Sequence, residues 1–247
     1  MTDLSDRRAM VTGAGSGIGR ACALALAQAG AELIVQDING DNAMVVASEI
    51  EANGGKAEAL VCDVADEARL ASAIRRIGPV TILVNNAGVA GQNAPLEAID
   101  REAYDRMMNT HVWGAFAATR MVLPGMKEAG WGRIINIASN RGQVGFERSS
   151  HYSAAKAALI ALAKSWAREF APYGILVNAI APGVVRTAMT LSYGEAAVAE
   201  EAQLNLLKRW ATPEEMAAWV MVLVSSTGDF MTGQLICPNG GDPIVGI

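Results

Sequence analysis

Near its amino end the chain reads Met10-Val11-Thr12-Gly13-Ala14-Gly15-Ser16-Gly17-Ile18-Gly19, a glycine-rich stretch between a short apolar run and a helix-like segment. Glycines allow a tight turn at such a junction and let the backbone approach a pyrophosphate, which the helix N–H groups and the positive end of the helix dipole then bind. The pattern is TGxxxGIG rather than GxGxxG, and it is not a Walker loop. The stretch therefore predicts a strand, a turn and a helix that together bind phosphate groups.

Outward from this turn, short apolar runs alternate with helix-like segments along the chain. The runs cover residues 9–11, 33–35, 59–61, 82–84, 134–138, 176–180 and 235–237. The segments between them, rich in alanine and poor in glycine, cover residues 18–29, 41–53, 67–77, 101–128, 152–170 and 213–225. Short, uniformly apolar runs are typical of buried parallel strands, so we expect an α/β fold with helices on both faces of a parallel sheet. Residues 188–207 break the alternation and are predicted to form a substrate flap, near residues 188–210.

Composition and charge exclude several classes of protein. Of the 247 residues, 51% are hydrophobic and 18% charged, which excludes intrinsic disorder. A formal charge of −5 argues against a nucleic-acid or anionic-membrane partner, because both favour a basic face. Cys22, Cys62 and Cys237 form no CxxC pair, which fits a reducing compartment and predicts no metal site. No apolar run approaches the roughly 20 residues of a membrane helix, and no signal peptide is evident, so we expect a cytoplasmic protein.

Polar residues follow three of the predicted strands. Asp37 stands at the end of the second apolar run, some 24 positions after Gly13, where a carboxylate can bind the adenosine ribose hydroxyls and repel a 2′-phosphate. This spacing favours NAD over NADP. Arg20 is the nearest cation, and we expect it to face solvent. Asp63-Val64 and Asn85-Asn86-Ala87-Gly88 each follow a further strand, at the sheet edge where open α/β sheets bind ligands.

A second group of polar residues lies later in the chain. Tyr152 and Lys156 are four residues apart, on one face of a predicted helix. A phenol near pKa 10 exchanges protons poorly at neutral pH, and a neighbouring ammonium stabilises the phenolate. Ser139 ends a strand thirteen residues before Tyr152, and Asn109 is an amide among methionines in the middle of a helix. We interpret His111 as a structural residue.

In order along the chain, these motifs resemble the short-chain dehydrogenase/reductase family over essentially its whole length. The matching positions are Thr12-Gly13, Gly17-Ile18-Gly19, Asp37, Asp63, Asn85-Asn86-Ala87-Gly88, Asn109, Ser139, Tyr152, Lys156, Pro182-Gly183, Thr187 and Asn239-Gly240-Gly241. The resemblance implies one Rossmann-type, doubly wound domain over residues 1–247, with a seven-stranded parallel sheet. Asn239 departs from the pattern, since such proteins often carry Asp there.

The resemblance also implies roles for individual residues. Tyr152 would be the general acid/base, and Lys156 would bind the nicotinamide ribose and lower the tyrosine pKa. Ser139 would orient the substrate together with Tyr152, and Asn109 would hold a water that relays protons. The residues that would bind the cofactor, NAD, are Gly13, Ser16, Gly17, Ile18, Gly19, Asp37, Asp63, Val64, Asn86, Ala87, Gly88, Tyr152, Lys156, Pro182, Gly183, Val185 and Thr187. By analogy residues 140–148 line the substrate side. Their charges fit either a polar substrate or a solvated loop, and we favour the solvated loop.

The leading hypothesis is an NAD(H)-dependent oxidoreductase that interconverts a secondary alcohol and a ketone. One alternative is a 3-oxoacyl-thioester (acyl carrier protein) reductase of the same family, against which Asp37 and the absence of a basic residue at Ser16 argue, because such enzymes usually use NADP. Another is a non-catalytic dinucleotide-binding protein, but the serine, tyrosine and lysine are all present. Residues 101–128 and 152–170 carry more apolar side chains than one sheet face covers, so we expect a homo-oligomer, a tetramer. The apolar end, residues 243–247, is expected to pack on a neighbouring subunit.

Overall fold

The computed structural model describes residues 2–245 and contains a seven-stranded sheet in which all paired strands run parallel. The strands are β1 (Arg8–Thr12), β2 (Glu32–Asp37), β3 (Lys56–Val61), β4 (Ile82–Asn85), β5 (Gly132–Ile137), β6 (Ile175–Ile180) and β7 (Leu235–Ile236). Their order is β3-β2-β1-β4-β5-β6-β7, so the chain runs outward from β1, returns to the centre at β4 and runs outward on the other side. The predicted α/β, doubly wound fold with seven parallel strands is confirmed.

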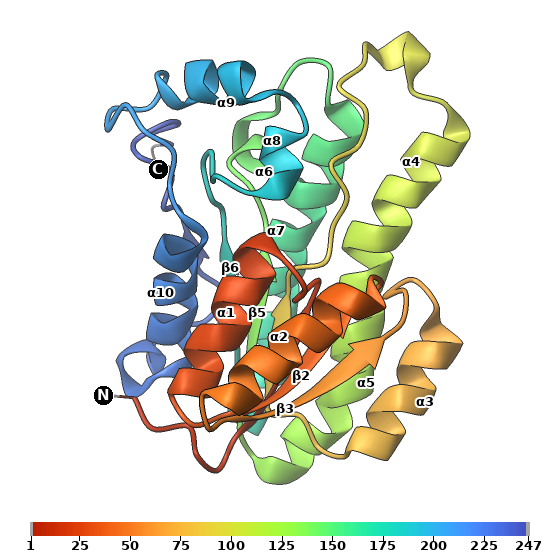
Figure 1. Ribbon diagram of the computed structural model, residues 1–247, viewed down its shortest axis with the longest axis vertical. Coiled ribbons are helices and arrows are strands. Elements are labelled where there is room, and N and C mark those ends of the chain that lie inside the picture. Colours follow the sequence, from red (N-terminus) through yellow and green to blue (C-terminus); the bar gives the residue numbers. More distant parts are fainter. Residues whose placement is uncertain (1, 246–247) are drawn as a thin grey trace.

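The helices cover both faces of the sheet. They are α1 (Gly17–Gln28), α2 (Gly40–Ala52), α3 (Glu67–Ile77), α4 (Arg101–Met108), α5 (Gly114–Ala129), α6 (Arg141–Val144), α7 (Ser150–Phe170), α8 (Ala188–Leu191), α9 (Glu195–Ala202) and α10 (Pro213–Val224). Short 3-10 turns occur at Leu96–Ala98, Ala171–Tyr173 and Ser226–Gly228. One hydrophobic core joins α1, α2 and α10 to the sheet, and a second joins α3, α5 and α7 to its other face, as Figure 1 shows.

The first strand illustrates why the predicted runs are uniformly apolar. Ala9 and Val11 belong to the core under α1, α2 and α10, whereas Met10 belongs to the core on the opposite face. All three side chains are fully buried, because helices cover both sides of the central strands. At the sheet edge β3 is covered less completely: exposed and partly buried residues alternate over its first four positions, and Leu60 alone of the strand is buried.

Two predicted helical segments differ in the structure. The segment 101–128 is not one regular helix, because a π-helical turn, η2 (Asn109–Trp113), separates α4 from α5. The segment 188–207 contains two short helices, α8 and α9, rather than one. Together with α6, these helices lie at one end of the molecule, beyond the carboxyl ends of β5 and β6 (Figure 1). Across residues 2–245 no helix combines the length and the apolar character that crossing a bilayer requires.

Candidate active site

A cavity of about 520 Å³ lies where the loops that follow β1 to β6 meet at the carboxyl edge of the sheet. The strand order reverses there, between β1 and β4, which is where doubly wound sheets bind their ligands. The predicted site residues that line the cavity are Gly13, Ser16, Gly17, Ile18, Asp37, Asp63, Val64, Asn86, Ala87, Gly88, Ser139, Tyr152, Lys156, Pro182, Gly183, Val185 and Thr187. Gly19 and Asn109, also predicted, are not among the lining residues.

The glycine-rich turn after β1 leaves helix N–H groups free at the cavity. Gly13 and Gly17 have φ angles of +63° and +53°, a backbone conformation that residues other than glycine rarely adopt. α1 begins behind Ser16, whose side chain makes no capping hydrogen bond, and its first turn holds no acidic residue. These N–H groups can therefore bind an anion. A side chain at Gly19 would collide with the carbonyl oxygen of Gly13, so glycine is required at this position of the turn.

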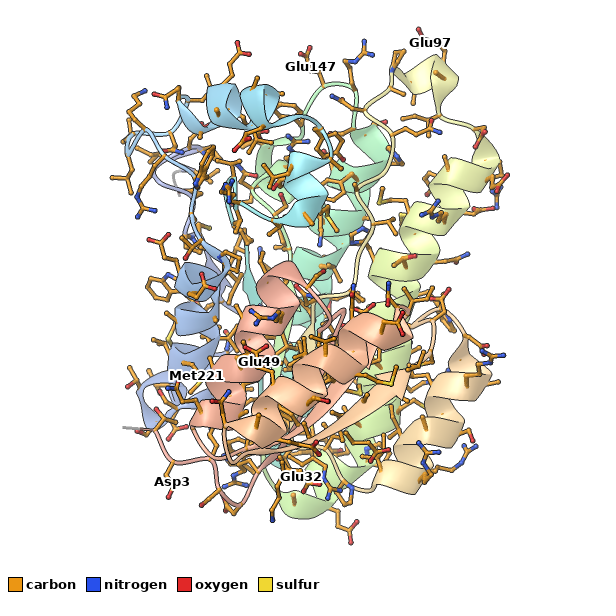
Figure 2. All side chains as sticks on the ribbon, viewed as in Figure 1. Asp3, Glu32, Glu49, Glu97, Glu147 and Met221 are labelled. Carbon is orange, nitrogen blue, oxygen red and sulfur yellow. The ribbon has the colours of Figure 1, made fainter. Side chains whose placement is uncertain are left out.

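Asp37 is fixed beside this turn. Its Oδ2 accepts a hydrogen bond from the Gly15 N–H at 2.8 Å, and its Oδ1 accepts one from the Asn39 N–H at 2.9 Å. Arg20 faces solvent as expected, with 40% of its side chain exposed, and its guanidinium also lies 2.6 Å from the carboxylate of Glu49 on α2. Glu49 is labelled in Figure 2. The cation one turn into α1 is thus paired with a carboxylate 29 positions away.

Buried side-chain amides tie the glycine turn to the neighbouring strands. Asn86 donates from Nδ2 to the carbonyl oxygens of Thr12 and Gly13, at 2.9 and 3.1 Å. Gln36 accepts from the Gly13 N–H at 3.2 Å and donates to the carbonyl oxygen of Cys62 at 2.7 Å. Gln36 is a site residue that was not predicted, although a glutamine directly after the apolar run 33–35 indicates a polar group at the carboxyl end of a strand.

Tyr152 and Lys156 lie one turn apart on α7, with Nζ 5.7 Å from the centre of the phenol ring. Lys156 is buried and donates to the carbonyl oxygen of Ile137 at 2.8 Å. Burial lowers the pKa of Lys156 to about 7. Burial also raises the pKa of Tyr152, an effect that the Ser139 hydroxyl and the Arg141 guanidinium oppose. The pKa of Tyr152 therefore moves opposite to the direction expected from a neighbouring ammonium alone.

The polar side chain that faces Tyr152 from the π-helical turn is His111, not Asn109. Asn109 is exposed and is not among the residues that line the cavity, so its membership of the site stays a prediction. His111 is buried, lines the cavity, and meets the Tyr152 ring edge-on with the ring centres 5.6 Å apart. Its Nε2 lies 3.0 Å from both the N–H and the carbonyl oxygen of Val89. Burial lowers the pKa of His111 to about 3, so the imidazole is neutral at physiological pH.

Gly88 and Gly91 leave room for the two histidines. A side chain at Gly88 would collide with the ring of His111, so glycine is required where the loop after β4 passes under it. A Cβ at Gly91 would lie 3.0 Å from Nε2 of His151. His151 is buried without lining the cavity, and neither of its ring nitrogens has a hydrogen-bond partner among residues 2–245.

The cavity is closed on one side by the start of the segment that holds α8. Thr187 caps α8 by accepting from the Thr190 N–H, and Thr190 donates to the carbonyl oxygen of Val185 at 2.7 Å. A Cβ at Gly17 would lie 3.3 Å from the Thr187 methyl group, so the loop after β6 approaches the glycine turn across the cavity.

The chain is similar to several known proteins. A family model described as short chain dehydrogenase matches residues 7–197. The chain is 35% identical over 240 residues to a cyclohexanol dehydrogenase of Acinetobacter sp., a match that covers 96% of this chain and 94% of that protein. A gluconate 5-dehydrogenase from Burkholderia cenocepacia, solved with NADP and tartrate, superposes with a TM-score of 0.91 and 33% identity, over 97% of this chain and 96% of that one. A 3-oxoacyl-[acyl-carrier protein] reductase from Brucella melitensis, solved with NAD, gives 0.90 and 32%, over 97% and 93%.

Proposed function

The chain belongs to the short-chain dehydrogenase family, and we propose that it transfers a hydride between NAD(H) and a secondary alcohol or ketone, with Tyr152 as general acid/base. Its relatives include alcohol dehydrogenases and a 3-oxoacyl reductase, so the chain is an oxidoreductase of CH–OH groups. The observation that carries the finer proposal is the placement of Ser139, Tyr152 and Lys156 in one part of a single cavity.

Tyr152 holds the proton that moves in the proposed reaction. In alcohol oxidation its phenolate oxygen accepts the hydroxyl proton, and in ketone reduction the phenol returns it. The chemistry that NAD supplies when bound is acceptance of a hydride from the carbinol carbon. Because burial disfavours the phenolate, a positive charge must offset it, and Lys156 can carry that charge at and below neutral pH. The two groups titrate as a pair, since each charged form stabilises the other.

Ser139 and His111 position the groups around the phenol. Ser139 is buried at the end of β5, and its hydroxyl lies close enough to Tyr152 to lower the pKa of the phenol. It is the donor that would orient the substrate oxygen. The neutral His111 ring holds the edge of Tyr152 in place and takes the position expected for Asn109.

The residues present fit a dinucleotide. The uncapped start of α1 at Gly17 suits a diphosphate, and the fixed carboxylate of Asp37 suits the two ribose hydroxyls of an adenosine. Lys156 and Thr187 would hold the nicotinamide end. We propose NAD as the preferred cofactor because the carboxylate of Asp37 would repel a 2′-phosphate and because Arg20, the cation one turn into α1, is paired with Glu49.

A second candidate function is reduction of a 3-oxoacyl thioester, which the similarity to the Brucella melitensis reductase favours. The two proposals differ in substrate and not in chemistry. They are separated by measuring NADH and NADPH oxidation with an acetoacetyl thioester, beside NAD⁺ reduction with a panel of secondary alcohols. Turnover of the thioester with efficiency above that of every alcohol would favour the second candidate.

We further propose that the chain is a homotetramer, that it is cytoplasmic, and that residues 188–210 act as a substrate flap within one domain. Trp113 and Phe116 are exposed next to each other on the outer side of α5, stacked with ring centres 5.8 Å apart. Exposed aromatic side chains on a helix commonly mark a contact with another subunit. Ile244 and Val245 are also exposed, whereas residues 246–247 of the apolar end lie outside the described residues.

The proposed chemistry is tested by the Tyr152→Phe variant. The variant should bind NADH as the unmodified protein does and should lose turnover of every alcohol in the panel. Retention of more than a tenth of the rate would contradict the role of the phenol.

A further inference from the structure

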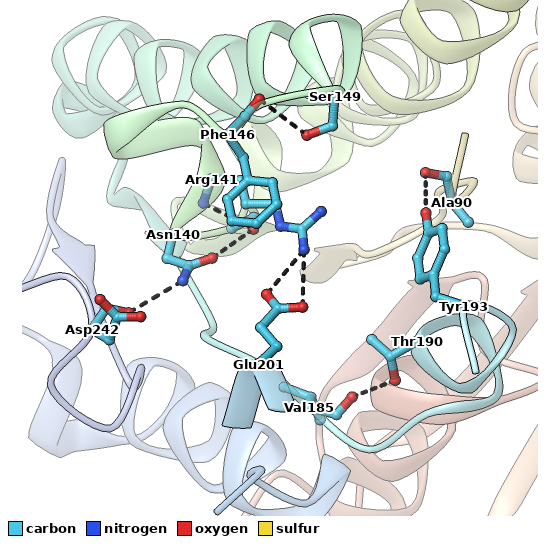
Figure 3. Close-up of polar contacts among 11 residues, drawn as sticks. Ala90, Asn140, Arg141, Phe146, Ser149, Val185, Thr190, Tyr193, Glu201 and Asp242 are labelled. Atoms are coloured by element: carbon cyan, nitrogen blue, oxygen red, sulfur yellow. Dashed lines mark hydrogen bonds and ion pairs between the residues drawn. The ribbon is translucent and has the colours of Figure 1, made fainter. Parts of the chain in front are cut away.

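An ion pair lies beside Ser139, where α6 and α9 meet. Arg141 begins α6 two residues after Ser139, and its Nη2 lies 2.9 and 3.0 Å from the two carboxylate oxygens of Glu201 on α9. Only 20% of the Arg141 side chain and 32% of the Glu201 side chain are exposed. Figure 3 shows the guanidinium and the carboxylate facing each other across the space between these two elements.

Two further contacts fix Arg141, one to its guanidinium and one to its backbone. The guanidinium lies 4.0 Å from the centre of the Phe146 ring, and Figure 3 shows the two groups together. The backbone N–H of the same residue donates to Ser139 Oγ at 3.2 Å. Arginine presents a planar set of donors that matches both oxygens of a carboxylate. The interpretation of residues 140–148 as a solvated loop is therefore wrong at Arg141.

The charges of this pair act on the reacting phenol. Burial raises the pKa of Tyr152, the Arg141 guanidinium lowers it, and the Glu201 carboxylate raises it. Arg141 and Glu201 are not among the residues that line the cavity, but the Arg141 N–H lies 3.2 Å from Ser139 Oγ, and Ser139 lines the cavity together with Tyr152. A carboxylate bound by Arg141 at this edge of the cavity would belong to the same small molecule as an alcohol oxygen at Tyr152.

Glu201 reaches Arg141 from the proposed flap. The flap makes a second polar contact with the rest of the protein, because the Tyr193 hydroxyl donates to the carbonyl oxygen of Ala90 at 2.7 Å (Figure 3). Glu147 is nearer to Arg141 in sequence, but it is exposed and points away from the molecule in Figure 2. Within residues 2–245 the carboxylate in contact with Arg141 is that of Glu201.

A contact that only held the flap would not need charges. Removing an arginine and a carboxylate from water carries a desolvation penalty, and apolar side chains of similar size often stabilise a protein as well or better. The half-buried guanidinium of Arg141 lies near Ser139. It can bind the carboxylate of a ligand in place of the internal carboxylate of Glu201.

We propose that Arg141 binds a carboxylate of the substrate and that Glu201 occupies this position when no substrate is bound. Resting on the proposed function, this assigns the substrate to hydroxy acids and the corresponding oxo acids. Binding would exchange one carboxylate for another at the same guanidinium, so Glu201 both preserves the orientation of Arg141 and competes with the substrate.

The test compares 4-hydroxycyclohexanecarboxylate with cyclohexanol, which lacks the carboxylate. We expect kcat/KM of the unmodified protein to favour the acid by about tenfold or more, because hydrogen bonds to charged groups are strong. Arg141→Gln should bring this ratio near one by lowering kcat/KM for the acid, with cyclohexanol changed less than about threefold. Glu201→Gln should raise the ratio by lowering KM for the acid. The matched control is Arg186→Gln, which breaks the exposed Arg186–Glu195 pair of the same segment and should leave the ratio unchanged.

Two results would overturn the inference. A ratio unaltered by Arg141→Gln would show that the guanidinium does not meet the substrate. An equal loss for both substrates in Arg141→Gln and Glu201→Gln would show that the pair only holds the flap. If the unmodified protein oxidises no alcohol, the proposed function fails, and calorimetric binding of cyclohexanecarboxylate to the NADH-saturated protein decides the inference separately. Equal affinities of the unmodified protein and Arg141→Gln would refute it there too.

Discussion

Replacing Asp37 by serine should weaken the proposed preference for NAD over NADP. Asp37 accepts hydrogen bonds from the Gly15 and Asn39 N–H groups, so the carboxylate cannot rotate away without losing them. A cofactor with a 2′-phosphate would place its charge beside this group. Arg20, one turn into α1, is paired with Glu49, which reduces the positive charge that it can offer against the repulsion.

The size of the preference follows from Coulomb's law. A 2′-phosphate carries about −1.5 to −2 charges at pH 7. At a separation of about 5 Å, its repulsion from one carboxylate is about 6 kcal/mol with an effective dielectric of 20 and about 1.5 kcal/mol in bulk water. Asp37 is half-buried, so we take about 3 kcal/mol, which is about 100-fold in kcat/KM for NAD⁺ over NADP⁺.

The assay follows absorbance of the reduced nicotinamide with each cofactor at a fixed alcohol concentration. Asp37→Ser should reduce the 100-fold ratio to below about tenfold, and adding Ile38→Arg should reduce it further. Asp41→Asn is the control, because it removes an exposed negative charge on the next helix without touching the turn, and it should change the ratio less than about twofold. Equal kinetics with both cofactors in the unmodified protein would refute the assignment, since Asp37 would then serve only its hydrogen bonds within the turn.

Three other changes test the site and the assembly. Tyr152→Phe should lower kcat by about 10²–10⁴-fold or more with NADH affinity retained by fluorescence titration, and a loss of both would point to misfolding instead. Because burial lowers the pKa of His111 from 6.5 to about 3, the unfolded chain binds a proton in this window that the folded chain does not. The free energy of unfolding should therefore fall as pH decreases from 6.5 toward 3, by up to about 1.4 kcal/mol per pH unit, and urea titrations should show a flatter profile for His111→Asn. Light scattering at micromolar concentration should give a tetramer for the unmodified protein and a smaller species for Trp113→Glu, whereas a monomer near 26 kDa for the unmodified protein would contradict the proposed assembly.

The parts of the fold that the sequence predicted are those governed by burial along one strand or helix. Ala9, Met10 and Val11 are all apolar because both sides of β1 are covered. This apolar run can be recognised from the sequence without knowing which elements pack against it. The glycine turn was predictable for a similar reason, since positive φ angles at Gly13 and Gly17 restrict the residue type at the position itself.

The features that the sequence did not predict depend on contacts distant in sequence. A regular helix was expected over 101–128, but a π-helical turn interrupts it, and His111 on that turn lies beside Tyr152. Arg20 meets Glu49 across two helices, and the pKa of Lys156 depends on burial by the assembled sheet rather than on its spacing from Tyr152. None of these effects can be obtained from local patterns.

The strand order has a consequence for synthesis on the ribosome. β1 pairs on one edge with β2, where Ala9 lies opposite Leu33, and this partner is synthesised early. Its other edge pairs with β4, where Ala9 lies opposite Ile82. Until residue 85 has left the exit tunnel, the nascent chain can assemble β1, β2 and β3 yet keeps the β1 edge open. The exposed row of backbone groups beside Ala9, Met10 and Val11 is then available to chaperones or to another nascent chain. Pairing of β1 with β4, which creates the ligand cavity, is thus also the last step that covers the open edge of the amino-terminal strands.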